Sequence, residues 1–329
     1  MPACGPPPTA HEWHAGVDDV LAGDVRPAAG LRRPIGISAV SRLVEKWRRR
    51  ARTAREVVRG QADLIRLTER LAATQLRQAV ASGHAGPWSD AGFRVFSQNE
   101  EDGLLIYVFA LVGTTSKYLV DIGCRSALGS NSANLLLNHG WQGLLVDADR
   151  DAVAELRHFY RLHPDTWMLP PTVLYERVTP TNVNDLVRSG DPPDEIDLLS
   201  LDIDGIDYWV WDALDIVRPR VIVVEAQVIW DADRAVTVPN DRGFEPIYRD
   251  GFAIYSGASV AAFDRLAERK GYALVGTNRL GYNLFFVRRD ILPATLRSIE
   301  PRDVTSLPFP RAARSRYLEE ISHMPWVDV

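Results

Sequence analysis

The sequence predicts an α/β fold built on a mostly parallel sheet with helices on both faces. Residues 118–149 read as a strand, a loop, a helix and a second strand, because two short apolar runs flank a helical pattern. Residues 196–201 and 220–227 are further apolar runs with the length of buried strands. We therefore interpret residues 118–149 as one βαβ unit of a Rossmann-like, nucleotide-binding sheet.

Composition limits the classes to which the protein can belong. With 329 residues, of which 46% are hydrophobic, the chain can bury the core of one large α/β domain and an appendage. The formal net charge of -5 gives no case for nucleic-acid binding. Cys4 and Cys124 are the only cysteines, so no disulfide framework is expected. Neither a transmembrane segment nor a signal-peptide core is recognisable, and we expect a soluble, cytoplasmic protein.

The chain before the predicted sheet divides into two parts. Residues 1–37 are rich in Pro, Gly and Ala and read as loosely ordered. Residues 38–92 read as a basic helical arm and linker, in which the helical pattern has eleven Arg and Lys against four acids. Three interpretations fit the arm: a dimerisation arm that makes a homodimer, a basic face on anionic membrane lipid, or a solvated helix packed on the following domain.

Further elements follow from local patterns. Ser97, with Glu100 three positions later, predicts a capping box and a helix that extends to residue 112. Gln98 in this segment faces either a ligand cleft or solvent. Helices are expected at 152–161 and 179–187, with a third strand at 172–175 between them. Residues 229–259 read as one long loop whose aromatic side chains either form a substrate lid or pack on the sheet.

A first candidate site lies in the βαβ unit. Gly123 and Gly129 let the backbone pass close to a ligand, and Asp147 at the end of the second strand can accept hydrogen bonds from two ribose hydroxyls. The glycine spacing in DIGCRSALG departs from the G-x-G-x-x-G of dinucleotide loops. Asp121, before the first glycine, suits a ligand with an amino group. The alternative is an ordinary strand-to-helix turn without a ligand.

A second candidate site collects oxygen ligands at the ends of two successive strands. Asp202 and Asp204 follow one strand, whereas Glu225 and Gln227 close the next. Hard cations such as Mg²⁺ prefer these ligands, and a metal could lower the pKa of a substrate hydroxyl. Alternatively, the acids cap the following helix and bind solvent.

Taken together, these segments resemble the FkbM-like class I S-adenosylmethionine-dependent methyltransferases over residues 96–292. The resemblance rests on the order of FSQNEEDGLL, YLVDIGCRSALGSNSANLLLNHGWQGLLVDAD, VTPTNVNDLV, DLLSLDIDGIDYWVWDAL, RVIVVEAQ and SGASVAAFDRLAERKGYALVGTNRLGYNLFFVRRD. It implies a methyltransferase-like domain at 93–295, followed by a C-terminal tail at 296–329. The domain's sheet would have seven strands, of which the last two are KGYALVG and NLFFVRR and the final one is antiparallel.

The resemblance also implies residue roles. Asp121 and Gly123 would bind the amino acid part of S-adenosyl-L-methionine, and Asp147 would bind its ribose. Asp202 and Asp204 would lie over the transfer centre as catalytic residues. The implied cofactor-binding set is Gln98, Asp121, Gly123, Cys124, Asn131, Asp147, Ala148, Glu176 and Asp202, with Arg177 beside the adenine. The implied metal ligands, for Mg²⁺, are Asp202, Asp204, Glu225 and Gln227.

The function expected from this resemblance is O-methyl transfer to a hydroxyl of a saccharide or secondary metabolite. Two positions depart from the family pattern: Arg125 stands where related sequences commonly have a second glycine, and Gln227 stands where an asparagine often closes the strand. Two alternatives remain open at this point. One is a degenerate binding or scaffold protein, and the other is a metal-dependent enzyme of another reaction class.

Overall fold

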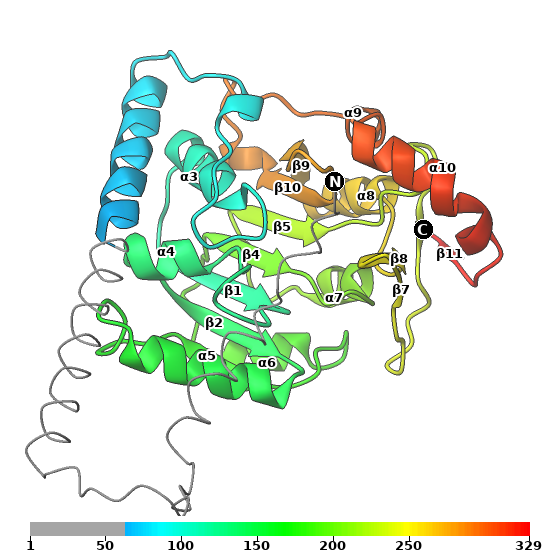
Figure 1. The fold of residues 1–329 in the computed structure, drawn as a ribbon, viewed down its shortest axis with the longest axis horizontal. Coiled ribbons are helices and arrows are strands. Elements are labelled where there is room, and N and C mark those ends of the chain that lie inside the picture. The colour runs from blue at the N-terminus through cyan, green and yellow to red at the C-terminus, as the bar shows by residue number, and fades with distance from the viewer. Residues whose placement is uncertain (1–62) are drawn as a thin grey trace, which may run out of the picture. The chain divides into compact units, whose positions relative to one another are not determined.

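A computed structural model describes residues 63–329, and Figure 1 shows their arrangement. Residues 63–81 are helical, as expected for this part of the basic arm. The predicted loose segment at 1–37 and the first part of the arm, residues 38–62, lie outside the described residues. No helix in the described part of the chain has the length and apolar character needed to cross a membrane.

A seven-stranded sheet forms the centre of the domain, with the strand order β3-β2-β1-β4-β5-β10-β9. Strand β10 is antiparallel to both of its neighbours, and the other pairs are parallel. This arrangement confirms the expected mostly parallel sheet of seven strands with an antiparallel final strand. The strands are β1 (Tyr118–Ile122), β2 (Gln142–Asp147), β3 (Thr172–Tyr175), β4 (Leu198–Leu201), β5 (Val221–Glu225), β9 (Tyr272–Thr277) and β10 (Asn283–Arg288).

Helices cover both faces of the sheet because the strands bury both sets of side chains. Leu119 and Val221 pack in the core beneath one group of helices, whereas Val120 and Ile222 pack in the core beneath the other. The first group comprises α3 (Glu101–Val112), α4 (Ala133–Asn138) and α5 (Arg150–Leu162). The second comprises α6 (Val183–Ser189), α7 (Asp207–Ala213) and α8 (Val260–Lys270).

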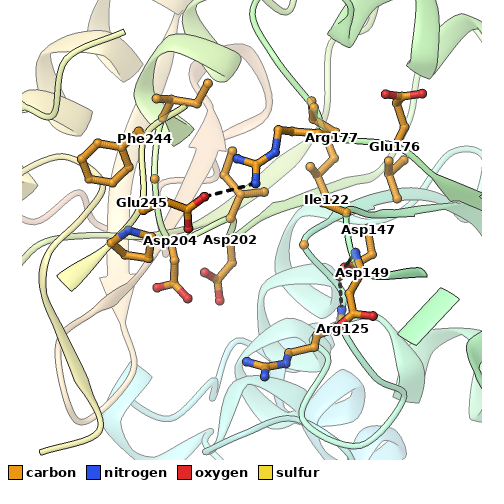
Figure 2. Close-up of a pocket in the computed structure, with 18 of the residues that line it drawn as sticks. Ile122, Arg125, Asp147, Asp149, Glu176, Arg177, Asp202, Asp204, Phe244 and Glu245 are labelled. Atoms are coloured by element: carbon orange, nitrogen blue, oxygen red, sulfur yellow. Dashed lines mark hydrogen bonds and ion pairs between the residues drawn. The ribbon is translucent and has the colours of Figure 1, made fainter. Parts of the chain in front are cut away.

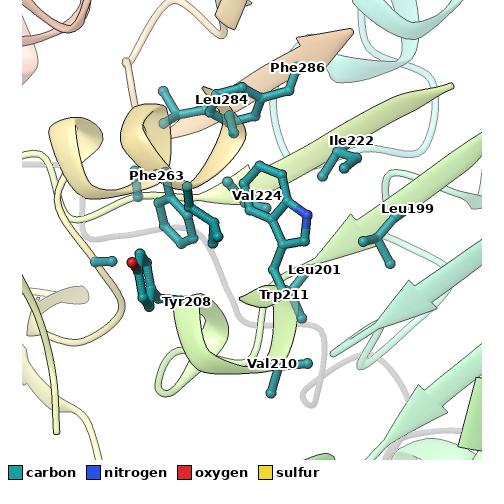
Figure 3. Packing of buried hydrophobic residues seen from close by; sticks show 14 of the residues in the cluster. Leu199, Leu201, Tyr208, Val210, Trp211, Ile222, Val224, Phe263, Leu284 and Phe286 are labelled. Atoms are coloured by element: carbon teal, nitrogen blue, oxygen red, sulfur yellow. The ribbon is translucent and has the colours of Figure 1, made fainter. Parts of the chain in front are cut away.

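Aromatic rings fill the second core (Figure 3). The rings of Trp211 and Phe286 lie 5.3 Å apart, and those of Trp211 and Phe263 lie 6.0 Å apart. Large rings bury more apolar area than any other side chain and favour tilted contacts of this kind. This packing fixes α7, and therefore also the loop that joins β4 to α7.

Short strands organise the segment that the sequence predicts as one long loop. It contains β6 (Val236–Thr237), β7 (Ile247–Arg249) and β8 (Phe252–Tyr255), of which the last two form a hairpin. The C-terminal segment forms α9 (Pro301–Thr305), α10 (Pro308–Ser322) and β11 (Val327–Asp328), which pairs with β6. Two 3₁₀ turns, Trp88–Asp90 and Arg289–Ile291, complete the described elements. The prediction of an irregular loop was therefore wrong in part, because strands this short have no readable period.

The predicted capping box at the start of α3 is also wrong. The helix begins at Glu101, so Glu100 and not Ser97 is the N-cap residue. The Ser97 hydroxyl donates to the Asp102 carboxylate at 2.9 Å and accepts the Asp102 N–H at 3.1 Å. The same Asp102 oxygen accepts the backbone N–H groups of residues 95, 96 and 97 at 2.7 to 2.8 Å. A carboxylate that accepts several N–H groups ties the entry segment to the helix more firmly than a serine cap would.

Candidate active site

The candidate site is a cleft at the carboxyl ends of β1, β2, β4 and β5. The strand order reverses between β1 and β4, and ligands of open α/β sheets bind at this point. Two cavities occupy the cleft, with volumes of 610 Å³ and 630 Å³. Gly123, Arg125, Asp202, Asp204 and Tyr248 line both of them, so the cavities are two halves of one cleft.

The loop after β1 lies directly against the end of β4. Gly123 has φ +87°, and its N–H donates to the Val146 carbonyl at 2.9 Å. A Cβ at this position would lie 1.6 Å from the Asp202 carbonyl oxygen. Only glycine fits here, and the backbone can therefore approach a ligand in the cleft closely.

Arg125 adopts a glycine-like backbone conformation in the same loop. Its φ is +39°, in the left-handed region that side chains other than glycine rarely occupy. Its N–H donates to Asp147 Oδ2 at 2.6 Å, and its exposed side chain lines the cavities. The position at which the family pattern has glycine is thus occupied by a strained arginine.

Asp147 is held at the end of β2 with its carboxylate in the 610 Å³ cavity (Figure 2). Its second oxygen accepts the Asp149 N–H at 2.8 Å, so both oxygens are fixed by backbone donors while further lone pairs stay available. Ala148 and Glu176 line the same cavity. Arg177 also lines it and forms an exposed ion pair with Glu245 at 3.5 Å.

Asp121 lies at the floor of the 630 Å³ cavity. Its Oδ2 accepts the hydroxyls of Ser130, at 3.1 Å, and Ser132, at 2.5 Å. Burial raises the pKa of Asp121 to about 6, although these hydroxyls and the Ser200 hydroxyl oppose the shift. Gln98, Cys124 and Asn131 line the same cavity. Burial also raises the pKa of the Cys124 thiol, which favours the neutral, unreactive form.

Three carboxylates meet between the two cavities. Asp202, Asp204 and Glu225 each place an oxygen within 4.8 Å of the other two, and each is partly exposed to the cleft. Burial, followed by the charges of Glu225 and Asp204, raises the pKa of Asp202 well above its usual range. Burial and the Asp204 charge likewise raise the pKa of Glu225 to about 8. A divalent cation, or a proton shared within the cluster, would relieve this repulsion.

Two neighbouring residues shape this carboxylate cluster. Tyr248 donates its hydroxyl to Asp204 Oδ2 at 2.7 Å, which together with burial raises the pKa of the tyrosine. Asp207 accepts the N–H groups of Ile203 and Gly205, each at 2.8 Å, and so closes the loop. Asp204 between them has φ +53°, and such strain is typical of functional loops.

Gln227, expected among the metal ligands, does not join the cluster. It is buried, and its side-chain amide donates to the carbonyls of Ala253 and Ile254 at 2.9 and 3.0 Å. Its side-chain oxygen accepts the Ile229 N–H at 3.2 Å. These bonds fasten β8 to the chain after β5, so the geometry gives Gln227 a structural role.

The structure adds lining residues that the sequence did not single out. Leu280, Tyr282 and Phe309 line the 630 Å³ cavity beside Phe252 and Tyr248, so that its outer wall is largely aromatic. Phe309 comes from α10, far along the chain from β1. No local pattern marks it, because only the fold brings the C-terminal helix to the cleft.

The chain is similar to known structures only at low sequence identity and low TM-score. No family model matches the sequence, and no curated protein matches it. Among solved structures, the chain is similar to the glycopeptide N-methyltransferase MtfA complexed with sinefungin, with 10% identity, a TM-score of 0.32 and coverage of 54% of this chain and 82% of that one. It is also similar to the CcbJ methyltransferase from Streptomyces caelestis, with 13% identity, a TM-score of 0.34 and coverage of 62% and 97%.

A third similar structure is the methyltransferase CalO1 of calicheamicin biosynthesis in its SAH-bound form, with 16% identity, a TM-score of 0.30 and coverage of 66% and 68%. These solved structures are all described as methyltransferases. Similarity at this level carries no argument about the activity of this chain. The case for its function depends on its own residues.

Proposed function

We propose that this chain is an S-adenosylmethionine-dependent O-methyltransferase that acts on a hydroxyl of a saccharide or small secondary metabolite. The observation that carries the proposal is the cleft at the switch point, in which Asp121 and Asp147 face two joined cavities on either side of Gly123. S-adenosylmethionine has an ammonium group and a ribose with two hydroxyls. Carboxylates at the ends of β1 and β2 match these two groups.

The residues present fit this cofactor. Asp121 would accept the ammonium group, and the fixed Asp147 carboxylate would accept both ribose hydroxyls. Glu176 and Arg177 would flank the base. Gly123 lets the loop after β1 pack against the Asp202 backbone, and it lines both cavities in which the ligand would lie. When bound, S-adenosylmethionine supplies an electrophilic methyl group, and its transfer leaves S-adenosylhomocysteine.

The carboxylate cluster would bind the acceptor hydroxyl and take up its proton. An acceptor hydroxyl must lose its proton as its oxygen forms the new bond to carbon, and that proton needs a base within hydrogen-bond reach. Glu225 is suited to this role because burial and the Asp204 charge raise its pKa, which makes its ionised carboxylate a stronger base than a free one, and Asp204 is the alternative. Tyr248 and Tyr282 would orient the acceptor ring at the mouth. Mg²⁺, if bound, would be held by Asp202, Asp204 and Glu225 and would supply Lewis acidity at the hydroxyl.

The first test is calorimetric titration of the full chain with S-adenosylmethionine and S-adenosylhomocysteine, with and without Mg²⁺. We expect both to bind, and Asp147→Ala to abolish binding while the variant keeps its circular dichroism spectrum. Absence of binding under every condition would reject the proposal.

A metal-dependent enzyme of another reaction class is the second candidate, and the geometry of the three carboxylates favours it. It predicts that Mg²⁺ binds to the Asp147→Ala protein as tightly as to the unaltered chain. It also predicts that Asp202→Ala abolishes this binding. The two candidates therefore differ in which substitution removes which ligand.

A further inference from the structure

Another cavity, with a volume of 900 Å³, lies next to the cleft. Its surface is mainly apolar, and the side chains that make it so are Trp88, Leu104, Leu280, Leu307, Pro308 and Phe309. Gln98, Leu280 and Phe309 line both this cavity and the 630 Å³ half of the cleft. Gln98 is exposed and the other two are partly exposed, so the boundary between the cavities is open to solvent. One ligand can therefore occupy this cavity and reach the carboxylate cluster.

Two aromatic rings in the wall of the cavity are fixed by packing. The Trp88 indole N–H donates to the Thr277 carbonyl at 2.8 Å, and the Trp88 ring lies 5.2 Å from that of Phe285. The Phe309 ring lies 5.3 Å from that of Phe252. Fixed rings bind an apolar ligand with little loss of side-chain freedom.

A buried carboxylate holds the loop between β9 and β10, which forms another part of the wall. Glu101 is 0% exposed, and its Oε1 accepts the side-chain amides of Asn278 and Asn283, each at 2.8 Å. These two asparagines lie at the two ends of the loop, on either side of Arg279 and Leu280. The loop is thus tied at both ends to the start of α3, and this part of the wall is preformed.

The charges around this cavity differ from those around the cleft. Among the described residues, five carboxylates and one arginine line the 630 Å³ half of the cleft. Two arginines, Arg94 and Arg279, and one carboxylate, Glu100, line the 900 Å³ cavity. The Arg94 guanidinium donates to the Gln98 carbonyl at 3.3 Å, a neutral acceptor that leaves its charge in place, and the Glu100 carboxylate accepts the backbone N–H of Arg279. The cavity therefore combines an apolar wall with an excess of positive charge.

We propose that the 900 Å³ cavity binds the acceptor of the methyl transfer, and that this acceptor is a small molecule with a bulky apolar body and an anionic group. The inference rests on the proposed function, because it takes the carboxylate cluster as the place of transfer. The apolar body lies against Trp88 and Leu307, and the anionic group faces Arg94 and Arg279. The hydroxyl reaches past Phe309 to the cluster. Large apolar cavities with a few polar groups are typical of small-molecule sites.

A saccharide fits this cavity less well. Each hydroxyl that faces an apolar wall loses its hydrogen bonds with water and gains none, which costs free energy. A neutral saccharide also has no charge to pair with the two arginines. Of the two acceptor classes in the proposed function, the cavity therefore favours the secondary metabolite.

The test is fluorescence titration of the full chain with anilinonaphthalenesulfonate, an aromatic anion, and with phenylnaphthylamine, the same ring system without the sulfonate. We expect one saturable site for the anion. The site should persist when S-adenosylhomocysteine is bound, because acceptor and cofactor must be bound together for transfer, and maltose should not displace the probe. Leu307→Asp should lower the affinity for both probes about tenfold or more, since it places a charge in the apolar wall. Position 307 is the N-cap of α10, where aspartate is favoured, so the helix should be retained.

A pair of arginine substitutions tests the charge separately. Arg94→Gln with Arg279→Gln should lower the affinity for the anion about tenfold and the affinity for the neutral probe less than about twofold. Arg161→Gln with Arg297→Gln is the matched control, because both arginines are exposed and line neither the cleft nor this cavity. The control pair removes the same net charge and should bind both probes like the unaltered chain.

Calorimetric titration of the same proteins with S-adenosylhomocysteine separates this inference from the proposed function. The Leu307 and arginine variants should bind it like the unaltered chain, which also shows that they are folded. Absence of this binding in the unaltered chain would reject the proposed function, and the acceptor role with it. Four results would overturn the inference alone: no saturable binding of the anion, its displacement by S-adenosylhomocysteine or by maltose, unchanged affinity in Leu307→Asp, or equal effects of the two arginine pairs.

Discussion

Arg125 combines a strained backbone conformation with a side chain that lines the cleft. Its φ of +39° costs a side-chain-bearing residue roughly 1–2 kcal/mol, a cost that glycine avoids. Its N–H nevertheless fixes Asp147, so the loop is held in place despite the strain. The backbone at position 125 is therefore left-handed although the residue there is arginine and not glycine.

Comparing Arg125→Gly with Arg125→Ala isolates the strain, because both variants lose the guanidinium. We expect Arg125→Gly to be more stable than Arg125→Ala by about 1 kcal/mol, since only alanine keeps the left-handed penalty. Urea denaturation of the two proteins measures the difference. Equal midpoints would show that the loop relaxes to negative φ once the arginine is removed.

Asp121 predicts a pH dependence of cofactor affinity. Its pKa of about 6 means that the carboxylate becomes neutral as the pH falls below that value. A neutral carboxyl no longer attracts an ammonium group, so the affinity for S-adenosylhomocysteine should fall by up to about tenfold per pH unit below pH 6. Above about pH 7 the contribution of Asp121 should be constant. Calorimetry over this range checks the slope.

Asp121→Asn is the control for that slope. The amide is neutral throughout, so the variant should bind weakly and with a flatter pH dependence. An unchanged slope in the variant would assign the titration to another group.

At the scale of elements, the loop between β4 and α7 is built around Asp207. Its two oxygens accept N–H groups on either side of Asp204 and so hold that residue at positive φ. The aromatic core packs against α7 and fixes this helix (Figure 3). Asp207 is the first residue of α7, so its position is fixed as well. Packing on one side of the sheet thereby determines where a carboxylate lies in the cleft.

Asp207→Asn should therefore lower both stability and metal affinity. The amide keeps one acceptor but turns an N–H₂ group toward a backbone donor, and an unmet buried bond of this kind costs about 1–3 kcal/mol. Urea denaturation near pH 8, where Asp207 is ionised, measures the loss. Asp212→Asn, on the same helix with a side chain that is 46% exposed, should change stability by less than about 0.5 kcal/mol.

Titration with Mg²⁺ tests the second half of this prediction. Loss of the Asp207 bonds frees Asp204 to leave the left-handed region, so the three carboxylates should hold Mg²⁺ more weakly than in the Asp212→Asn protein. Equal affinities in the two variants would mean that Asp204 keeps its position without Asp207.

At the scale of the whole molecule, the sequence predicted the sheet well. A strand that is buried on both faces consists of a short run of apolar residues, and such a run can be recognised without knowledge of the rest of the chain. Ligands bind at the carboxyl ends of the strands in such sheets, and from this rule the sequence analysis predicted that Asp202, Asp204 and Glu225 lie close together. Features that depend on distant segments were not predictable. Phe309 reaches the cleft only through the packing of α10, and Gln227 is occupied by carbonyls of β8 that no spacing reveals.

Prediction from short sequence patterns also failed where the same pattern is compatible with two different sets of hydrogen bonds. Ser97 and Glu100 have the spacing of a capping box, but Asp102 competes for Ser97 and collects three backbone donors as well. Arginine at 125 gave no local sign of positive φ, because glycine is the residue that normally marks it. Hydrogen bonds between residues close in sequence are thus no easier to predict than distant contacts when several acceptors compete.

The described domain should fold without the residues that precede it. Contacts divide the chain into residues 1–61 and residues 62–329, and within the described part of the chain the second unit contains both cores and the residues that line the cleft. A chain that starts at residue 62 should therefore keep a cooperative thermal transition and bind S-adenosylhomocysteine as the full chain does. Differential scanning calorimetry and titration check both outcomes. Retained folding with lost cofactor binding would show that residues 1–61 contribute to cofactor binding.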